Sequence, residues 1–293
     1  MKVLVTTPES AIGYELLSLL ISEGFSVRAL CLPEDCARLE EAGVETVAGD
    51  LLDEEQTHVA MSEVGAVFNC STVMEFDRKK GRRAALINTD GTRNLLVSMA
   101  RQGVEQLVHV GSAFAFPPES GTRPPAATAS VRTAAGLVTR YVRDKKLKAF
   151  TVNPGLVLGR HDHEGPGARV IKRGLTWKGT PPGGGCSVVS AVDVASVALK
   201  LLGRGKSGEV RTVAPYDVSY SDLFDLVRSV AARDGEVAVP RPKRTSELDS
   251  FLSGDFYYAA EAASEDLGVI WTLLPLTVEE AYLAVKEIPG EIF

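Results

Sequence analysis

The first residues with the means to do chemistry form a short polar turn near the start of the chain. A three-residue apolar run at 3–5 leads into the turn Thr7-Pro8-Glu9-Ser10, and Ile12 and Leu16 then begin a helical repeat. A strand, a turn and a helix in this order are typical of loops that hold phosphates at a helix N-terminus. Such a loop normally carries three glycines, whereas this one keeps only Gly13.

Glu9 brings a negative charge to the place where a phosphate would bind. Two like charges about 5 Å apart repel by roughly 3 kcal/mol at an effective dielectric near 20, which is about a hundredfold in affinity. Our hypothesis is that Glu9 and Ser10 cap the first helix and partly replace a ligand's anion. The alternative is that Glu9 faces solvent and has no effect on a ligand.

A second polar cluster is His161-Asp162-His163-Glu164. Two histidines one residue apart reach a common metal only on a strand, and the flanking glycines predict a loop. We therefore favour a polar loop facing a substrate over a metal site.

The composition limits the class of protein and its partners. The chain has 293 residues, 45% hydrophobic and 24% charged, which suits a soluble globular protein. A net charge of -6 argues against nucleic acid or an acidic membrane as partner. The four cysteines form no C-x-x-C pair, which predicts a reducing cytoplasm, and no apolar run is long enough to span a membrane.

Strand-like and helix-like segments alternate along the first half of the chain, and two further helix-like segments follow in the second half. The expected strands are Val3–Thr6, Val27–Leu32, Glu45–Ala48, Ala66–Cys70, Gln106–Val110 and Ala149–Val152. The expected helices are Ala11–Ser22, Cys36–Ala42, Ala84–Gln102, Ala127–Arg143, Ser219–Ala232 and Val278–Glu287. This alternation predicts an α/β fold, a doubly wound, Rossmann-like parallel sheet with a small C-terminal substrate lobe. We expect the core at 1–159, with 188–204 returning to the sheet, and the lobe at 160–187 and 205–293.

Five further stretches resemble, in order, the extended or atypical short-chain dehydrogenases/reductases of the NAD-dependent epimerase/dehydratase type. They are Gly49-Asp50-Leu51-Leu52-Asp53, Asn88-Thr89-Asp90-Gly91-Thr92-Arg93-Asn94-Leu95-Leu96, Leu107-Val108-His109-Val110-Gly111-Ser112, Asn153-Pro154-Gly155-Leu156-Val157-Leu158-Gly159 and Val188-Val189-Ser190-Ala191-Val192-Asp193-Val194-Ala195. The resemblance implies the fold strongly, but a fold hosts many functions.

The resemblance also implies where NAD or NADP would bind. The three glycine positions fall on Thr7, Ser10 and Gly13, so only the helix-packing glycine is kept. The implied cofactor-binding residues are Thr7, Ser10, Ala11, Ile12, Asp50, Leu51, Asn69, Cys70, Ser71, Asn88 and Pro154. Cys31-Leu32-Pro33 stands where the family carries an acid for NAD or an Arg for NADP, so neither preference is encoded.

Catalysis in this family uses a Ser or Thr with a Tyr and a Lys four residues later. By resemblance, Ser112 takes the Ser position, and Thr128 and Arg132 stand at the Tyr and Lys positions. Threonine cannot replace the phenol as acid or base. Tyr141-Val142-Arg143-Asp144-Lys145 has the spacing, but its Tyr would lie about 20 Å further along the helix.

Two classes of function follow. The first is an altered, ligand-binding or sensor member of this family, with a small-molecule ligand in the cleft between core and lobe. The second is an active NAD(P)-dependent oxidoreductase or epimerase on a small alcohol, ketone or sugar. The resemblance also implies a homodimer through the helices at 84–102 and 127–143.

Overall fold

The large sheet of the protein contains seven parallel strands. The structure, a computed structural model, describes residues 1–145, 147–235, 246–259 and 266–286. The strands are β1 (Lys2–Thr6), β2 (Ser26–Cys31), β3 (Glu45–Ala48), β4 (Ala66–Asn69), β5 (Gln106–Val110), β6 (Lys148–Pro154) and β9 (Val210–Val213). Their order in the sheet is β3-β2-β1-β4-β5-β6-β9. The chain therefore winds outward in both directions from β1, as a doubly wound fold does, and the predicted fold class is confirmed.

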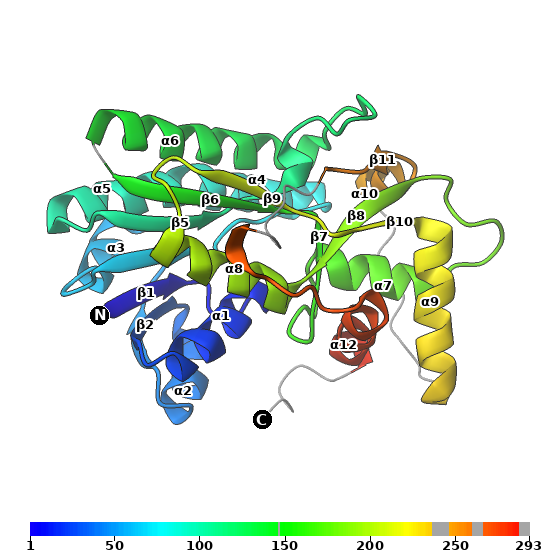
Figure 1. Ribbon diagram of the computed structural model, residues 1–293, viewed down its shortest axis with the longest axis horizontal. Helices are drawn as coiled ribbons and strands as arrows, with labels where there is room; N and C mark the ends of the chain where they lie inside the picture. Colours follow the sequence, from blue (N-terminus) through cyan, green and yellow to red (C-terminus); the bar gives the residue numbers. More distant parts are fainter. Residues whose placement is uncertain (146, 236–245, 260–265, 287–293) are drawn as a thin grey trace.

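Helices cover both faces of this sheet (Figure 1). One layer holds α1 (Ala11–Ser22), α2 (Pro33–Glu41) and α8 (Ala191–Arg204). The other holds α3 (Glu54–Ala60), α4 (Arg78–Leu86), α5 (Thr92–Gln102) and α6 (Ala129–Lys145). A short π-helix, η1 (Ile87–Gly91), joins α4 to α5. Each layer packs on its own apolar cluster, because strands buried on both faces are hydrophobic throughout.

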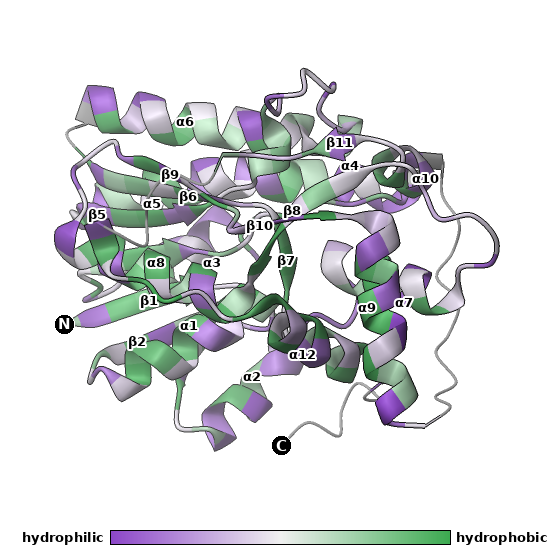
Figure 2. Ribbon diagram, turned by 45° about the vertical axis from the view of Figure 1, so that its right-hand side comes forward, coloured by the Kyte–Doolittle hydropathy of each residue, from purple (hydrophilic) through white to green (hydrophobic). Residues whose placement is uncertain are grey.

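The remaining elements form a second, smaller unit. Its strands are β7 (Leu156–Leu158), β8 (Gly185–Ser190), β10 (Tyr216–Ser219) and β11 (Asp255–Phe256). Its helices are α7 (Pro166–Thr176), α9 (Tyr220–Arg233), α10 (Ser246–Leu252) and α12 (Leu274–Lys286). Figure 2 shows apolar β7 inside this unit and α9 with alternating polar and apolar faces. Within the described ranges, no helix is long and apolar enough to cross a membrane.

One expectation about the sheet is wrong. We expected residues 188–204 to return to the large sheet, but β8 pairs with β7, β10 and β11 in the second sheet. The seventh strand of the large sheet is β9, from the range assigned to the lobe, and it pairs with β6. Of the expected return, α8 packs on the core beside α1, and Val189 of β8 joins the same apolar cluster. The division of the chain into core and lobe stays a prediction.

Helix boundaries differ by a few residues from those expected. The helix expected from Ala84 begins at Arg78, because Asp77 accepts a hydrogen bond from the amide of Lys79 and so caps it. The last helix begins at Leu274 instead of Val278, and Glu287, its expected end, lies outside the described residues.

Candidate functional site

A cavity of about 440 Å³ opens at the carboxyl ends of the central strands. Its floor is formed by residues that directly follow β1, β4, β5 and β6, among them Thr7, Cys70, Gly111 and Gly155. Residues 161–167, after β7, form the opposite wall. The volume lies in the range of small-molecule sites, and its position is the one at which doubly wound sheets bind ligands.

The entrance turn keeps a tight conformation despite its missing glycines. Thr7 has φ +51°, a left-handed value that a β-branched residue adopts only under strain. A Cβ on Gly13 would lie 2.4 Å from the carbonyl oxygen of Thr7, so this glycine is required for close packing. The first glycine position therefore still has the backbone shape that favours glycine, although a threonine occupies it.

Ser10 caps α1. Its hydroxyl oxygen accepts a hydrogen bond from the amide of Gly13 at 3.1 Å, and the hydroxyl donates to the carbonyl of Thr7 at 2.9 Å. One of the amides that would face a phosphate is therefore already bonded within the chain. This part of the capping hypothesis agrees with the geometry.

Glu9 does not cap the helix in the same way. It lines the cavity, and its Oε2 is buried without a hydrogen-bond partner among the described residues. Burial raises the pKa of Glu9 to about 7, while a hydrogen bond from its own amide opposes the rise. The side chain faces the protein interior, so the solvent-facing alternative does not describe it.

Eight of the implied site residues line this cavity together. They are Thr7, Ser10, Ala11, Ile12, Cys70, Ser71, Ser112 and Pro154. Asp50 and Leu51, two of the implied cofactor-binding residues, are not among the lining residues. Asp50 instead pairs with Arg83 at 2.7 Å and accepts from the amide of Leu52, and Leu51 is 7% exposed.

Asn69 and Asn88 lie behind the cavity and hold its walls. The side chain of Asn69 is fully buried, where its Oδ1 accepts from Thr6 Oγ1 at 3.0 Å and its Nδ2 lies 3.1 Å from His109 Nδ1. Burial lowers the pKa of His109 to about 4, so the ring is neutral at ordinary pH. Asn88 bonds both the amide and the carbonyl of Val73, a residue of the cavity wall. Each asparagine therefore acts as a positioning residue in this structure.

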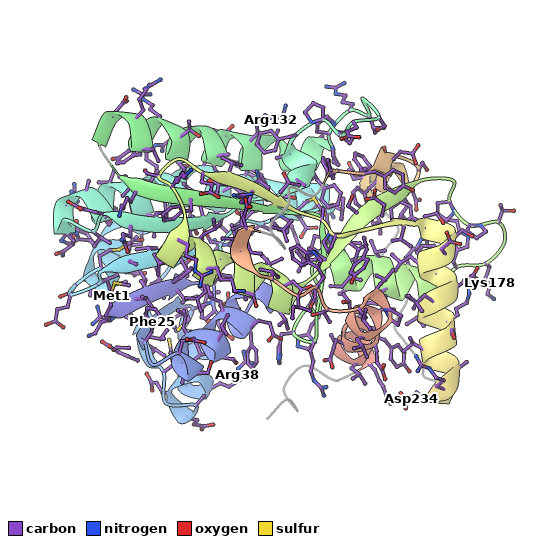
Figure 3. The ribbon with its side chains drawn as sticks, in the orientation of Figure 1. Met1, Phe25, Arg38, Arg132, Lys178 and Asp234 are labelled. Atoms are coloured by element: carbon purple, nitrogen blue, oxygen red, sulfur yellow. The ribbon has the colours of Figure 1, made fainter. Side chains whose placement is uncertain are left out.

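The positions expected to carry acid–base chemistry do not meet in the cavity. Ser112 lines it, but Thr128 is fully buried, and its hydroxyl donates to the carbonyls of Phe114 and Pro125. Arg132 is exposed on α6 (Figure 3). Tyr141 packs against the apolar cluster beneath α5 and α6 and is not a lining residue. Neither Thr128 nor Tyr141 places an oxygen in the cavity.

The comparisons with known proteins agree with this architecture. Residues 9–204 match a family model described as NAD(P)H-binding. The chain belongs to the NAD(P)H-binding family. No curated protein matches the chain.

Solved structures similar to this NAD(P)H-binding family member include three sugar-nucleotide enzymes. UDP-glucose 4-epimerase from Thermotoga maritima has a TM-score of 0.77 at 19% identity, covering 97% of this chain and 98% of that one. UDP-glucose 4-epimerase from Thermus thermophilus, in complex with NAD, has a TM-score of 0.76 at 21% identity, covering 100% of both chains. A dTDP-glucose 4,6-dehydratase from Streptomyces venezuelae has a TM-score of 0.77 at 18% identity, covering 99% and 98%. The resemblance to extended or atypical short-chain dehydrogenases/reductases is confirmed. At these identities, likeness to individual enzymes extends to the fold alone.

Three polar side chains of the loop after β7 make contacts within the protein. The His161 ring packs against the ring of Tyr14 of α1, with ring centres 3.5 Å apart and planes inclined by 32°, and burial lowers the His161 pKa to about 4. His163 Nδ1 lies 2.9 Å from the carbonyl of Ala284. Asp162 accepts from the amides of Gly165 and Ala168 at the start of α7. In the described part of the chain, no three His, Cys, Asp or Glu side chains gather as a metal site.

Sequence reasoning missed the charged residues at the α7 wall. Glu75, from the loop after β4, and Arg169, on α7, line the cavity and form an ion pair with each other. Lys80 of α4 also lines it. Their signal was weak, because a single Glu and a single Arg far apart in sequence form no motif.

Proposed function

We propose that this protein is an altered member of the NAD(P)H-binding family that binds a small molecule in this cavity without the acid–base chemistry of its relatives. The proposal rests on where the structure puts the residues at the family's Tyr and Lys positions. Thr128 is buried with its hydroxyl bonded to two carbonyls, and Arg132 is exposed on α6. A group that cannot reach the substrate cannot transfer a proton to it.

NAD or NADP is the first ligand to test, because the family model begins at Glu9 in the entrance turn and covers the cavity-floor residues that follow β4, β5 and β6. A diphosphate at this turn meets the carboxylate of Glu9. With a pKa of about 7, Glu9 can take up a proton and lose its charge. We infer that a dinucleotide binds preferentially to the form in which Glu9 is protonated.

An active NAD(P)-dependent oxidoreductase or epimerase on a small alcohol, ketone or sugar is the second candidate. Its support is Ser112, whose side chain lies at the cavity where the family places a substrate-binding hydroxyl. Water or a substrate group would then have to supply the missing acid.

One experiment separates the two candidates. The protein is incubated with NADH and NADPH at pH 6, and binding is followed by nicotinamide fluorescence and thermal shift. Turnover is then measured with small alcohols, ketones, UDP-glucose and dTDP-glucose, with Ser112→Ala as the matched control. We expect binding without turnover. Turnover that Ser112→Ala abolishes would establish the second candidate. If neither NADH nor NADPH binds, the ligand of the cavity is not a nicotinamide dinucleotide.

A further inference from the structure

Two cysteine side chains meet where β2 turns into α2. Cys31 is the last residue of β2, and Cys36 lies in the first turns of α2. Their sulfur atoms are 2.9 Å apart, and both cysteines are free thiols. The five-residue spacing hides this pair from a search for C-x-x-C motifs.

The two thiols differ in access. Cys31 is 2% exposed, whereas Cys36 is half-buried, with its Sγ 3.4 Å from the carbonyl oxygen of Leu32. Burial and then the hydrogen bond with Cys36 raise the pKa of Cys31, so this sulfur keeps its proton. A reagent from solution therefore meets Cys36 first, with Cys31 directly behind it.

We propose that Cys31 and Cys36 form a redox-active dithiol, which hydroperoxides and small disulfides oxidise to an intramolecular disulfide. A separation of 2.9 Å requires only a small approach to reach a bonded length near 2.05 Å. This site is distinct from the ligand cavity, whose lining includes neither cysteine.

The chemistry balances with a hydroperoxide as the oxidant. The Cys36 sulfur, having lost its proton, attacks the terminal peroxide oxygen; an S–O bond forms, the O–O bond breaks, and an alcohol or water leaves. The Cys31 sulfur then attacks the Cys36 sulfur, so that the S–S bond forms and the S–O bond breaks. Water leaves with the thiol proton of Cys31. The two sulfurs together lose two electrons, and the peroxide gains them.

The other two cysteines provide internal controls. Cys70 and Cys186 are buried, and burial raises the pKa of each thiol to about 12. Buried thiols that remain protonated react slowly with oxidants. Oxidation is therefore expected to select Cys31 and Cys36 over Cys70 and Cys186.

The test treats the reduced, full-length protein with hydrogen peroxide or oxidised glutathione, alkylates the remaining thiols, and maps them by mass spectrometry. We expect a loss of two hydrogen atoms, a cross-link between the peptides of Cys31 and Cys36, and full reversal by dithiothreitol. Cys31→Ser should instead retain a glutathione adduct on Cys36, and Cys186→Ser, at a buried cysteine outside the cavity lining, should behave as wild type.

Three results in the wild type would overturn the proposal, and none depends on a variant folding. They are a stable glutathione adduct on Cys36, a cross-link that involves Cys70 or Cys186, and no reaction at either Cys31 or Cys36.

Discussion

Glu75 and Arg169 form a two-point ion pair that joins the loop after β4 to helix α7 at the wall of the cavity. Both Nη nitrogens of Arg169 donate to the carboxylate of Glu75, and the Nη2–Oε2 distance is 3.1 Å. The side chain of Glu75 is 10% exposed and that of Arg169 is 22% exposed. The pair connects the large-sheet unit to the second unit directly at the cavity, which both residues line.

Removing one charge of this pair should be more destabilising than removing a charge at the surface. Glu75→Gln leaves a largely buried guanidinium with a weaker acceptor, so we expect the free energy of unfolding to fall by about 1–3 kcal/mol. Asp90→Asn, which breaks the exposed pair with Arg93, is the control and should change it by less than about 1 kcal/mol. Urea denaturation measures both, and equal effects would contradict the role given to Glu75.

Thr128 should contribute to stability and not to ligand binding. Thr128→Val keeps the shape but removes the hydroxyl that satisfies the carbonyls of Phe114 and Pro125. We expect a loss of about 1–2 kcal/mol in unfolding free energy, with unchanged dinucleotide affinity. The matched control is Thr133→Val, in the exposed face of α6. If Thr128→Val lowers the ligand affinity without lowering the stability, Thr128 takes part in ligand binding.

The strain at Thr7 predicts an ordering of two variants. At φ +51°, Gly is free of the steric cost that any Cβ meets, so Thr7→Gly should be more stable than Thr7→Ala by about 1 kcal/mol. Thermal and urea unfolding of the two variants give the comparison. Equal stabilities would show that the turn relaxes to a different conformation.

The sequence predicted the fold because its strands and helices are marked by local patterns. Buried strands such as Val3–Thr6 are short apolar runs, and Gly103 ends a helix at φ +69°, as a C-terminal glycine does. Strand partners are less local. The local sequence of residues 185–190 and 210–213 does not show which of these strands joins the large sheet, because the sheet that a strand joins depends on long-range pairing.

The site was only partly predictable for a related reason. The residues that follow the central strands were found, since the carboxyl ends of parallel strands meet at one edge. The sequence could not show that Asp50 lies outside the cavity, because its ion-pair partner, Arg83, is 33 residues away and belongs to no motif. The direction of the Glu9 side chain and the contact of Cys31 with Cys36 are also properties of the folded chain alone.

Glu9 should make stability depend on pH in a defined direction. Its pKa is raised from 4.5 to about 7 by burial, so between these values the folded state holds a proton that the unfolded state has released. Stability therefore falls as pH rises through this window, and the loss is complete above pH 7. Relative to wild type, Glu9→Gln should gain about 2 kcal/mol in unfolding free energy between pH 5 and pH 8.

The control for this series is Glu41→Gln, an exposed glutamate of α2. Its difference from wild type should not change between pH 5 and pH 8. If the difference in unfolding free energy between Glu9→Gln and wild type is also the same at pH 5 and pH 8, the carboxyl of Glu9 reaches solvent.

The most direct test of the account is a calorimetric titration of NADH into wild type and Glu9→Gln at pH 6 and pH 8. If a dinucleotide binds only when Glu9 is protonated, the competent fraction falls from about nine-tenths to about one-tenth over this range. The account predicts that the wild-type dissociation constant rises about tenfold from pH 6 to pH 8, with proton uptake on binding, while that of Glu9→Gln stays constant. A wild-type affinity as independent of pH as that of Glu9→Gln would contradict the claim that Glu9 opposes the diphosphate.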